Sequence, residues 1–136
     1  MKIGEYDVPI RFNSKAMIDI ETLIGGDVEK LADYIGDKNV STGETLKRVA
    51  DILTCLANGA VFTHNQDIKC GFKQGEERKF LTADFFLAHI DVDHMQEIMS
   101  SVFAEINKGT AVIIPDGVKI AEEDEVLAEI ENIKNQ

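Results

Sequence analysis

The stretch from Ser41 to Asn58 constrains the fold most strongly, because it has the pattern of a long amphipathic helix. Ser41 and Glu44 have the S-x-x-E spacing of a capping box, in which each side chain satisfies a free backbone N–H of the first turn. Gly59 follows and predicts the end of the helix. An isolated helix of this length is marginal in water, so its apolar face needs a partner within the fold. Apolar residues recur along it at helical spacing and form one stripe: Leu46, Val49, Ala50, Leu53, Leu56 and Ala57.

Shorter patterns on either side predict a mainly α-helical domain with a small N-terminal β element. Alternating apolar residues predict a β-hairpin over residues 2–12, with Pro9 placing its second strand at an edge. Helical spacing predicts helices over about residues 14–24, 27–35, 42–58 and 83–108. Within the last range, Asp91 either caps a second helix or continues the first. We expect a second apolar stripe to be the main partner of the stripe in 42–58: Val92, Met95, Ile98, Met99, Val102, Phe103 and Ile106.

The remaining segments predict one compact domain followed by a separate C-terminal segment. A single compact domain is expected over residues 1–120, followed by an acidic C-terminal helix or tail over 121–136. Residues 60–62 either continue the central helix past a kink or begin a loop. Residues 63–78 are mostly polar and predict a loop, with a short β element at 68–72. Apolar residues of the tail form a strip that either docks on the body or binds a groove of a partner: Val126, Leu127, Ile130 and Ile133.

Charge and composition exclude several classes of function. A net charge of -11 over 136 residues argues against nucleic-acid binding, which needs clustered lysine and arginine. An acidic surface suits solubility or a basic protein partner. No apolar run has the length of a signal peptide or of a membrane span, so we expect a soluble, cytoplasmic protein.

One cluster has the residue types of a metal site. His89, Asp91, Asp93 and His94 lie within the string HIDVDH, and imidazole and carboxylate groups at such short spacing bind divalent metals when they converge. The alternative is that Asp91 caps a helix and the other side chains are solvated. The sequence alone leaves both interpretations open.

The sequence contains no recognisable catalytic motif. It has no G-x-S-x-G, no H-E-x-x-H and no glycine-rich phosphate loop, so neither an enzyme nor a cofactor is predicted. Cys55 lies on the apolar stripe and is expected to be buried and unreactive. Cys70, beside Lys69 and near His64, is a candidate for a modestly activated thiol, but no base and orienting group are placed around it. Two reduced thiols are the expectation.

The opening third of the chain resembles the tail assembly chaperones of long-tailed phages and prophages of Gram-positive bacteria. The resemblance covers residues 5–36 and lies in a short strand ending in Ile10-Arg11-Phe12, followed by Lys15-Ala16 and then Ile20-Glu21 on the first helix. A short second helix and a long third helix follow in the same order. A small acidic chain with a charged C-terminal segment also fits that family.

This resemblance implies a non-enzymatic protein without a cofactor. It would keep the long tape-measure protein soluble in the host cytoplasm before tail-tube subunits polymerise around it. Relatives often have a longer, frameshifted form that contacts tube protein, and the ending Ile133-Lys134-Asn135 is compatible with a slippery codon run. No contact residue carries over from the family, and the exposed stripes leave self-association open. The rival hypotheses are a small acidic inhibitor of a basic partner and a metal-dependent enzyme built on HIDVDH.

Overall fold

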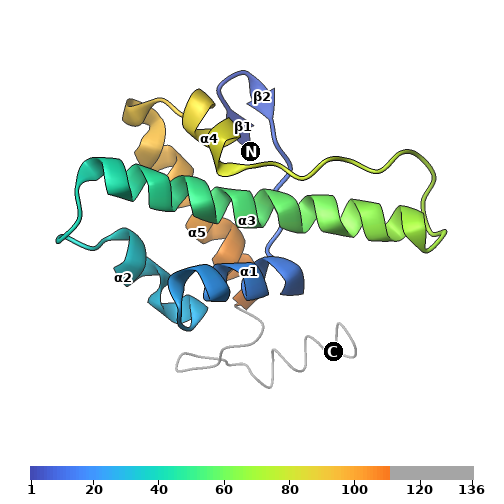
Figure 1. Cartoon of the computed structure of the whole chain (residues 1–136), viewed down its shortest axis with the longest axis horizontal. Coiled ribbons are helices and arrows are strands. Elements are labelled where there is room, and N and C mark those ends of the chain that lie inside the picture. The colour runs from blue at the N-terminus through green and yellow to red at the C-terminus, as the bar shows by residue number, and fades with distance from the viewer. Residues whose placement is uncertain (111–136) are drawn as a thin grey trace. The chain divides into compact units, whose positions relative to one another are not determined.

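The computed structural model describes residues 1–110, which are mainly α-helical with a two-stranded antiparallel sheet at the N-terminus, as predicted (Figure 1). The chain divides into two units, Met1–Ser101 and Val102–Gln136. The expected boundary at residue 120 and the acidic helix or tail over 121–136 lie outside the described residues.

The N-terminal sheet is shorter than the hairpin predicted over residues 2–12. Strands β1 (Lys2–Ile3) and β2 (Tyr6–Asp7) pair antiparallel through a turn in which Gly4 has a φ of 63°. One further bond, from Val8 N–H to the carbonyl oxygen of Met1 (2.7 Å), closes the ladder. Pro9 has no N–H to donate, so the ladder cannot continue in the same way. The chain beyond it packs against a helix instead of a strand.

The first helices lie where the sequence predicts them. Helix α1 (Ser14–Ile24) is capped by Asn13, whose side chain accepts a hydrogen bond from Ala16 N–H (3.0 Å), and it ends at Gly25 with a φ of 72°. The region predicted as a helix over 27–35 forms a 3-10 turn, η1 (Val28–Lys30), followed by α2 (Leu31–Ile35).

Helix α3 (Thr42–Lys69) starts as predicted but is much longer than the predicted 42–58. Ser41 caps it by accepting a hydrogen bond from Glu44 N–H (3.1 Å). The predicted end at Gly59 is wrong, and so are the loop from residue 63 and the β element at 68–72, because the helix continues to Lys69. Residues 60–62 therefore continue the helix.

Gly59 lies within α3 and allows another segment to pack closely against the helix at this position. A Cβ atom at this position would lie 2.6 Å from the carbonyl oxygen of Arg11, 2.9 Å from Oδ1 of Asn13 and 3.0 Å from Cβ of Ala16. Arg11 N–H donates to the carbonyl oxygen of Leu56 (3.0 Å) at the same crossing. The missing side chain lets the start of α1 lie directly on α3.

Helices α1 and α4 (Ala83–His89) pack on opposite sides of α3 (Figure 1). Within Met1–Ser101, α1 and α4 are the principal partners of α3. The main seam expected between 42–58 and the helix at 92–108 reaches into the second unit and stays a prediction. Burial from two sides also explains why Ile52, outside the predicted stripe, is fully buried. Leu46 of that stripe is only half-buried.

The helix predicted over 83–108 is interrupted. Helix α4 ends at His89, Ile90 is extended (φ -91°, ψ 124°), and the chain re-enters a helix through η2 (Val92–His94) and α5 (Met95–Thr110). Ile90 and the two residues after it all have lower helix propensity than alanine or leucine, so a break there costs little. Of the second unit the structure describes 102–110, the end of α5, in which Val102 and Ile106 are buried.

Substituting Gly59 by alanine should destabilise the protein, although alanine is the better helix former by about 1 kcal/mol. The added methyl group would meet backbone at 2.6 Å, and overpacking of this kind costs about 1–3 kcal/mol. The free energy of unfolding from urea titration measures the change. Gly43→Ala is the matched control, because the nearest atom to a new Cβ there is Ser41 Oγ at 3.8 Å. A Gly59→Ala protein as stable as the control would contradict the close crossing.

Candidate functional site

The structure brings together three of the four residues of the HIDVDH cluster, for which the sequence left metal binding and a solvated helix start both open. The ligand atoms of Asp91, Asp93 and His94 lie within 4.8 Å of one another, and all three side chains are exposed. His89 is not part of this group, because its ring packs against Tyr6 (4.9 Å between ring centroids) and Phe85 (4.8 Å). A metal ion bound by these three exposed side chains would take most of its other ligands from water. Asp91 is the N-cap residue of η2, but its side chain makes no capping hydrogen bond. Asp93 and His94 are exposed, as the alternative interpretation expects, whereas the ring of His89 is packed.

The two thiols differ in environment. Cys55 is half-buried, and its pKa is raised to about 12, first by burial and then by the carboxylates of Asp19 and Asp51. Cys70 is exposed at the C-terminal end of α3 instead of in a loop. Because the thiolate is the reactive form, Cys55 is a poor nucleophile at neutral pH.

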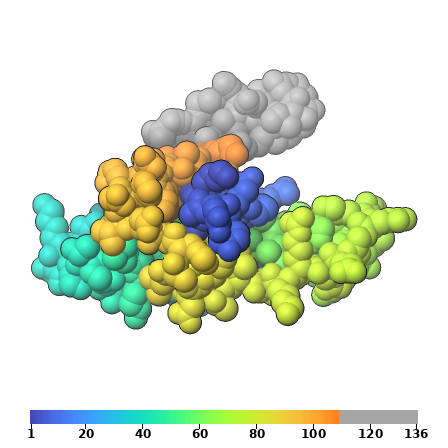
Figure 2. Space-filling view, turned by 90° about the horizontal axis from the view of Figure 1, so that it is seen from above, coloured from blue at the N-terminus to red at the C-terminus, as the bar shows by residue number. Residues whose placement is uncertain are grey.

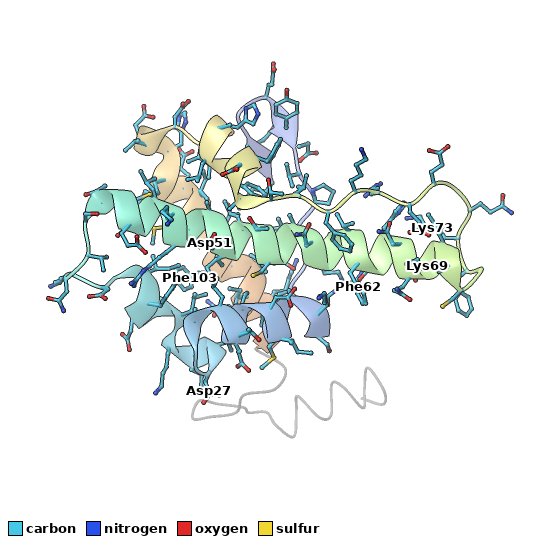
Figure 3. All side chains as sticks on the ribbon, in the orientation of Figure 1. Asp27, Asp51, Phe62, Lys69, Lys73 and Phe103 are labelled. Carbon is cyan, nitrogen blue, oxygen red and sulfur yellow. The ribbon has the colours of Figure 1, made fainter. Side chains whose placement is uncertain are left out.

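The imidazole of His64 is engaged on both sides and does not act as a base toward Cys70. Its Nε2 lies 2.9 Å from the carbonyl oxygen of Glu76, and its Nδ1 lies 3.0 Å from Nζ of Lys73. An ammonium group can only donate, so Nδ1 accepts and the Nε2–H donates to Glu76. Lys69 and Lys73 lie together at the far end of α3 (Figure 3). These contacts hold the turn after α3 in place.

Residues 76–81, which we call the strap, run back along α3 without forming a helix or a strand (Figure 1). Two asparagines of α3 hold the strap by its backbone. Asn58 donates to the carbonyl oxygen of Leu81 (3.0 Å) and accepts from Leu81 N–H (2.8 Å). Asn65 makes the same pair of bonds with Arg78, at 3.0 Å and 2.8 Å. A side-chain amide thus takes the place that a neighbouring strand would occupy in a sheet.

The spacing of the two asparagines matches the spacing of the residues they hold. Asn58 and Asn65 are seven residues apart, which corresponds to about 10.5 Å along a helix axis. Arg78 and Leu81 are three residues apart, which corresponds to about 9–10 Å in an extended chain. Asn65 is also the one buried polar residue of the described core, at 4% exposure. Its amide needs the bonds that the strap supplies, because an unpaired buried amide is costly.

The strap forms one wall of an apolar groove of about 220 Å³, which we call the strap groove. Its floor is α3, its second wall is the N-terminal segment, and Phe85 of α4 closes one end. Figure 2 shows this face, with the N-terminal segment in blue and the strap in yellow-green bordering the green atoms of α3. The groove is lined by Tyr6, Asp7, Val8, Pro9, Ala57, Ala60, Val61, Arg78, Lys79, Leu81 and Phe85.

The charges of the strap groove are placed asymmetrically. Arg78 and Lys79 lie on the strap wall, and within residues 1–108 neither side chain has an ion-pair partner. Asp7 lies on the other wall, where one of its oxygens pairs with the N-terminal ammonium group at 3.3 Å. The groove therefore joins an apolar floor to two available cations on one side.

A second recess of about 490 Å³ lies between β1 and the start of α5. Its lining mixes Lys2 with Asp91 and Glu97, and it also includes His89 and His94. This mixture offers neither a continuous apolar surface nor a single sign of charge. The strap groove is the better-defined candidate.

Sequence reasoning missed the strap groove and placed its binding residues elsewhere. The predicted strip Val126, Leu127, Ile130 and Ile133 lies outside the described residues. The available signal was the pair Asn58 and Asn65, at heptad spacing on one helix, with apolar Val61 between them on the same face.

Comparison with known proteins does not identify a family for this chain. The sequence matches no family model, no curated protein and no solved structure at a significant level. Within residues 1–110, none of the helices combines the length and the apolar character that crossing a membrane requires.

Asn65→Leu should release the strap, because the substitution removes both bonds to Arg78 without leaving a cavity. We expect a loss of about 1–3 kcal/mol in the free energy of unfolding and faster trypsin cleavage after Arg78 and Lys79 in the folded protein. Limited proteolysis followed by mass spectrometry identifies the cut. Asn39→Leu, at an exposed asparagine ahead of α3, is the control and should leave cleavage unchanged. Equal cleavage of the two variants would show that the strap is held by something else.

The thiols should react with a maleimide at very different rates. With a pKa of about 12, only about one Cys55 in ten thousand is a thiolate at pH 8. A Cys70→Ser protein should therefore label slowly, and its rate should rise about tenfold per pH unit well beyond pH 9, where an ordinary thiol levels off. Labelling of that variant as fast as in denaturant would contradict the buried environment of Cys55.

Proposed function

We propose that the chain is a non-enzymatic tail assembly chaperone of a phage or prophage. In this role it binds the tape-measure protein in the host cytoplasm, keeps it soluble and helps tail-tube subunits assemble around it. The observation that carries the proposal is the strap groove, a recess with a mainly apolar lining, bounded by chain that is hydrogen-bonded in place. Such a surface suits the binding of protein segments.

The depth of the groove suits weak and reversible binding. Its volume of about 220 Å³ is below the 300–1,000 Å³ typical of pockets for drug-sized ligands, and it accommodates one large apolar side chain. Burying one such side chain contributes about 1.5–3 kcal/mol, which is far from enough for a lasting complex. Many copies along a long client would mask its apolar residues and still be released when tube subunits arrive.

The resemblance to tail assembly chaperones adds independent support. It covers residues 5–36, and this stretch includes Tyr6, Val8 and Pro9, which form one wall of the strap groove. The part of the chain that resembles the family therefore contributes to the surface that we assign to client binding. A contact with tail-tube protein through a longer form of the chain belongs to the same proposal.

The geometry gives less support to the two rival hypotheses, a metal-dependent enzyme and an acidic inhibitor. The three clustered groups at Asp91, Asp93 and His94 are exposed, which gives little support to a metal-dependent enzyme. An acidic inhibitor would present carboxylates to a basic partner, whereas the available charges of the groove belong to Arg78 and Lys79. We therefore retain protein masking as the proposed activity.

Co-expression with the tape-measure protein should raise the soluble yield of that protein, and filling the groove should abolish the benefit. Ala60→Trp places an indole on the groove floor, while Ala88→Trp adds the same group at an exposed position of α4. The chain has no tryptophan of its own, so fluorescence of the new indole reports whether each variant is folded. Equal soluble yield with and without the wild-type chain would refute the proposal. Full activity of folded Ala60→Trp would refute the assignment to this groove.

A further inference from the structure

We propose that the strap groove selects segments in which a large apolar residue is flanked by carboxylates. The apolar side chain lies on the floor formed by Ala57, Ala60 and Val61, and the acidic residues pair with Arg78 and Lys79 on the strap wall. This inference rests on the proposed function, that the chain binds segments of another protein, and it defines the kind of segment.

The two walls of the groove differ in charge. Arg78 and Lys79 lie on the strap side and have no ion-pair partner in the part of the chain that the structure describes. On the opposite side the carboxylate of Asp7 pairs with the N-terminal ammonium group (3.3 Å). A client carboxylate on the strap side therefore meets available cations, whereas a client lysine there meets like charge.

The strap carries its two cations on a backbone that is held in place by hydrogen bonds. Asn65 bonds both backbone groups of Arg78, and Asn58 does the same for Leu81 two residues after Lys79. The backbone that carries the cations is therefore ordered before a client binds, so less entropy is lost on binding. The wall opposite contains Tyr6, which is 44% exposed and packs edge-on against Phe85 (5.7 Å between ring centroids). Aromatic walls of this kind suit a leucine or phenylalanine side chain.

The acidic character of the whole chain does not oppose this preference. At physiological ionic strength the charges of exposed groups are screened beyond about 8 Å. A carboxylate in the groove is therefore governed by the cations next to it and only weakly by the net charge of -11. The same screening predicts that the preference for acidic segments declines as salt is added.

Synthetic peptides test the selection directly. Three fluorescent peptides share one length: one has a central leucine between glutamates, the second has the leucine between lysines, and the third has serine between glutamates. Each exposed ion pair contributes roughly a two- to fivefold gain in affinity, so anisotropy titration should show the first peptide binding about tenfold more tightly than the second. The serine peptide should bind much more weakly than the first, because it lacks the apolar anchor.

Charge reversal identifies the residues responsible. Arg78→Glu combined with Lys79→Glu should invert the order of the glutamate and lysine peptides, and the bonds from Asn65 to the backbone at position 78 are unaffected by the side-chain change. Lys30→Glu combined with Lys38→Glu changes the net charge by the same amount at exposed positions outside the groove lining and should leave the order unchanged.

The outcomes separate this inference from the proposed function. Equal binding of all three peptides, no binding of any, or an order unaffected by reversal at positions 78 and 79 would overturn the selection rule. If the tape-measure protein were still solubilised in that case, the proposed function would stand without it. The expected peptide order together with an insoluble tape-measure protein would support the selection rule and refute the proposed client.

Discussion

The contact between Gly59 and the start of α1 is the constraint on which the described fold depends. At this crossing the backbone of Arg11 donates to Leu56, and Asn13 donates through Nδ2 to the carbonyl oxygen of Gly59 (2.9 Å) and to Oγ1 of Thr63 (2.8 Å). The same Asn13 side chain caps α1 through its oxygen. One residue therefore starts α1 and fixes its position on α3, and this works only because position 59 has no side chain.

The strap groove follows from that arrangement. Its N-terminal wall is fixed to α3 by the contacts of Arg11 and Asn13, and its strap wall is fixed to the same helix by Asn58 and Asn65. Both walls are thus attached to one rigid element within about three turns of helix. The opening between them is set by α3 and does not depend on flexible loops, which makes the groove a defined surface before any partner binds.

Local sequence information was sufficient for α1, for the start of α3 and for the mainly helical class, because caps and apolar spacing act over a few residues. It failed at Gly59, since glycine signals both a helix end and a close packing contact, and only the distant Arg11–Asn13 segment decides between them. Near Ile90 it left open whether Asp91 caps a new helix or continues the first, because apolar periodicity runs on through the break. The groove was missed because its floor and walls come from three segments far apart in the chain. Asp91, Asp93 and His94 are neighbours in sequence, so their clustering follows from the sequence itself, whereas the packing of His89 on Tyr6 depends on a distant segment.

The way in which α3 holds the strap has a consequence for variation among related chains. The amides of Asn58 and Asn65 bind only main-chain atoms, so among the side chains at positions 76–81 they exclude only proline at 78 and 81, which would remove a donor N–H. Mutations there can exchange the lining of one wall without disturbing the helix beneath it. A lineage that kept the two asparagines and Gly59 would be free to acquire new binding preferences by drift in six surface positions, much as antibody loops diversify on a constant framework.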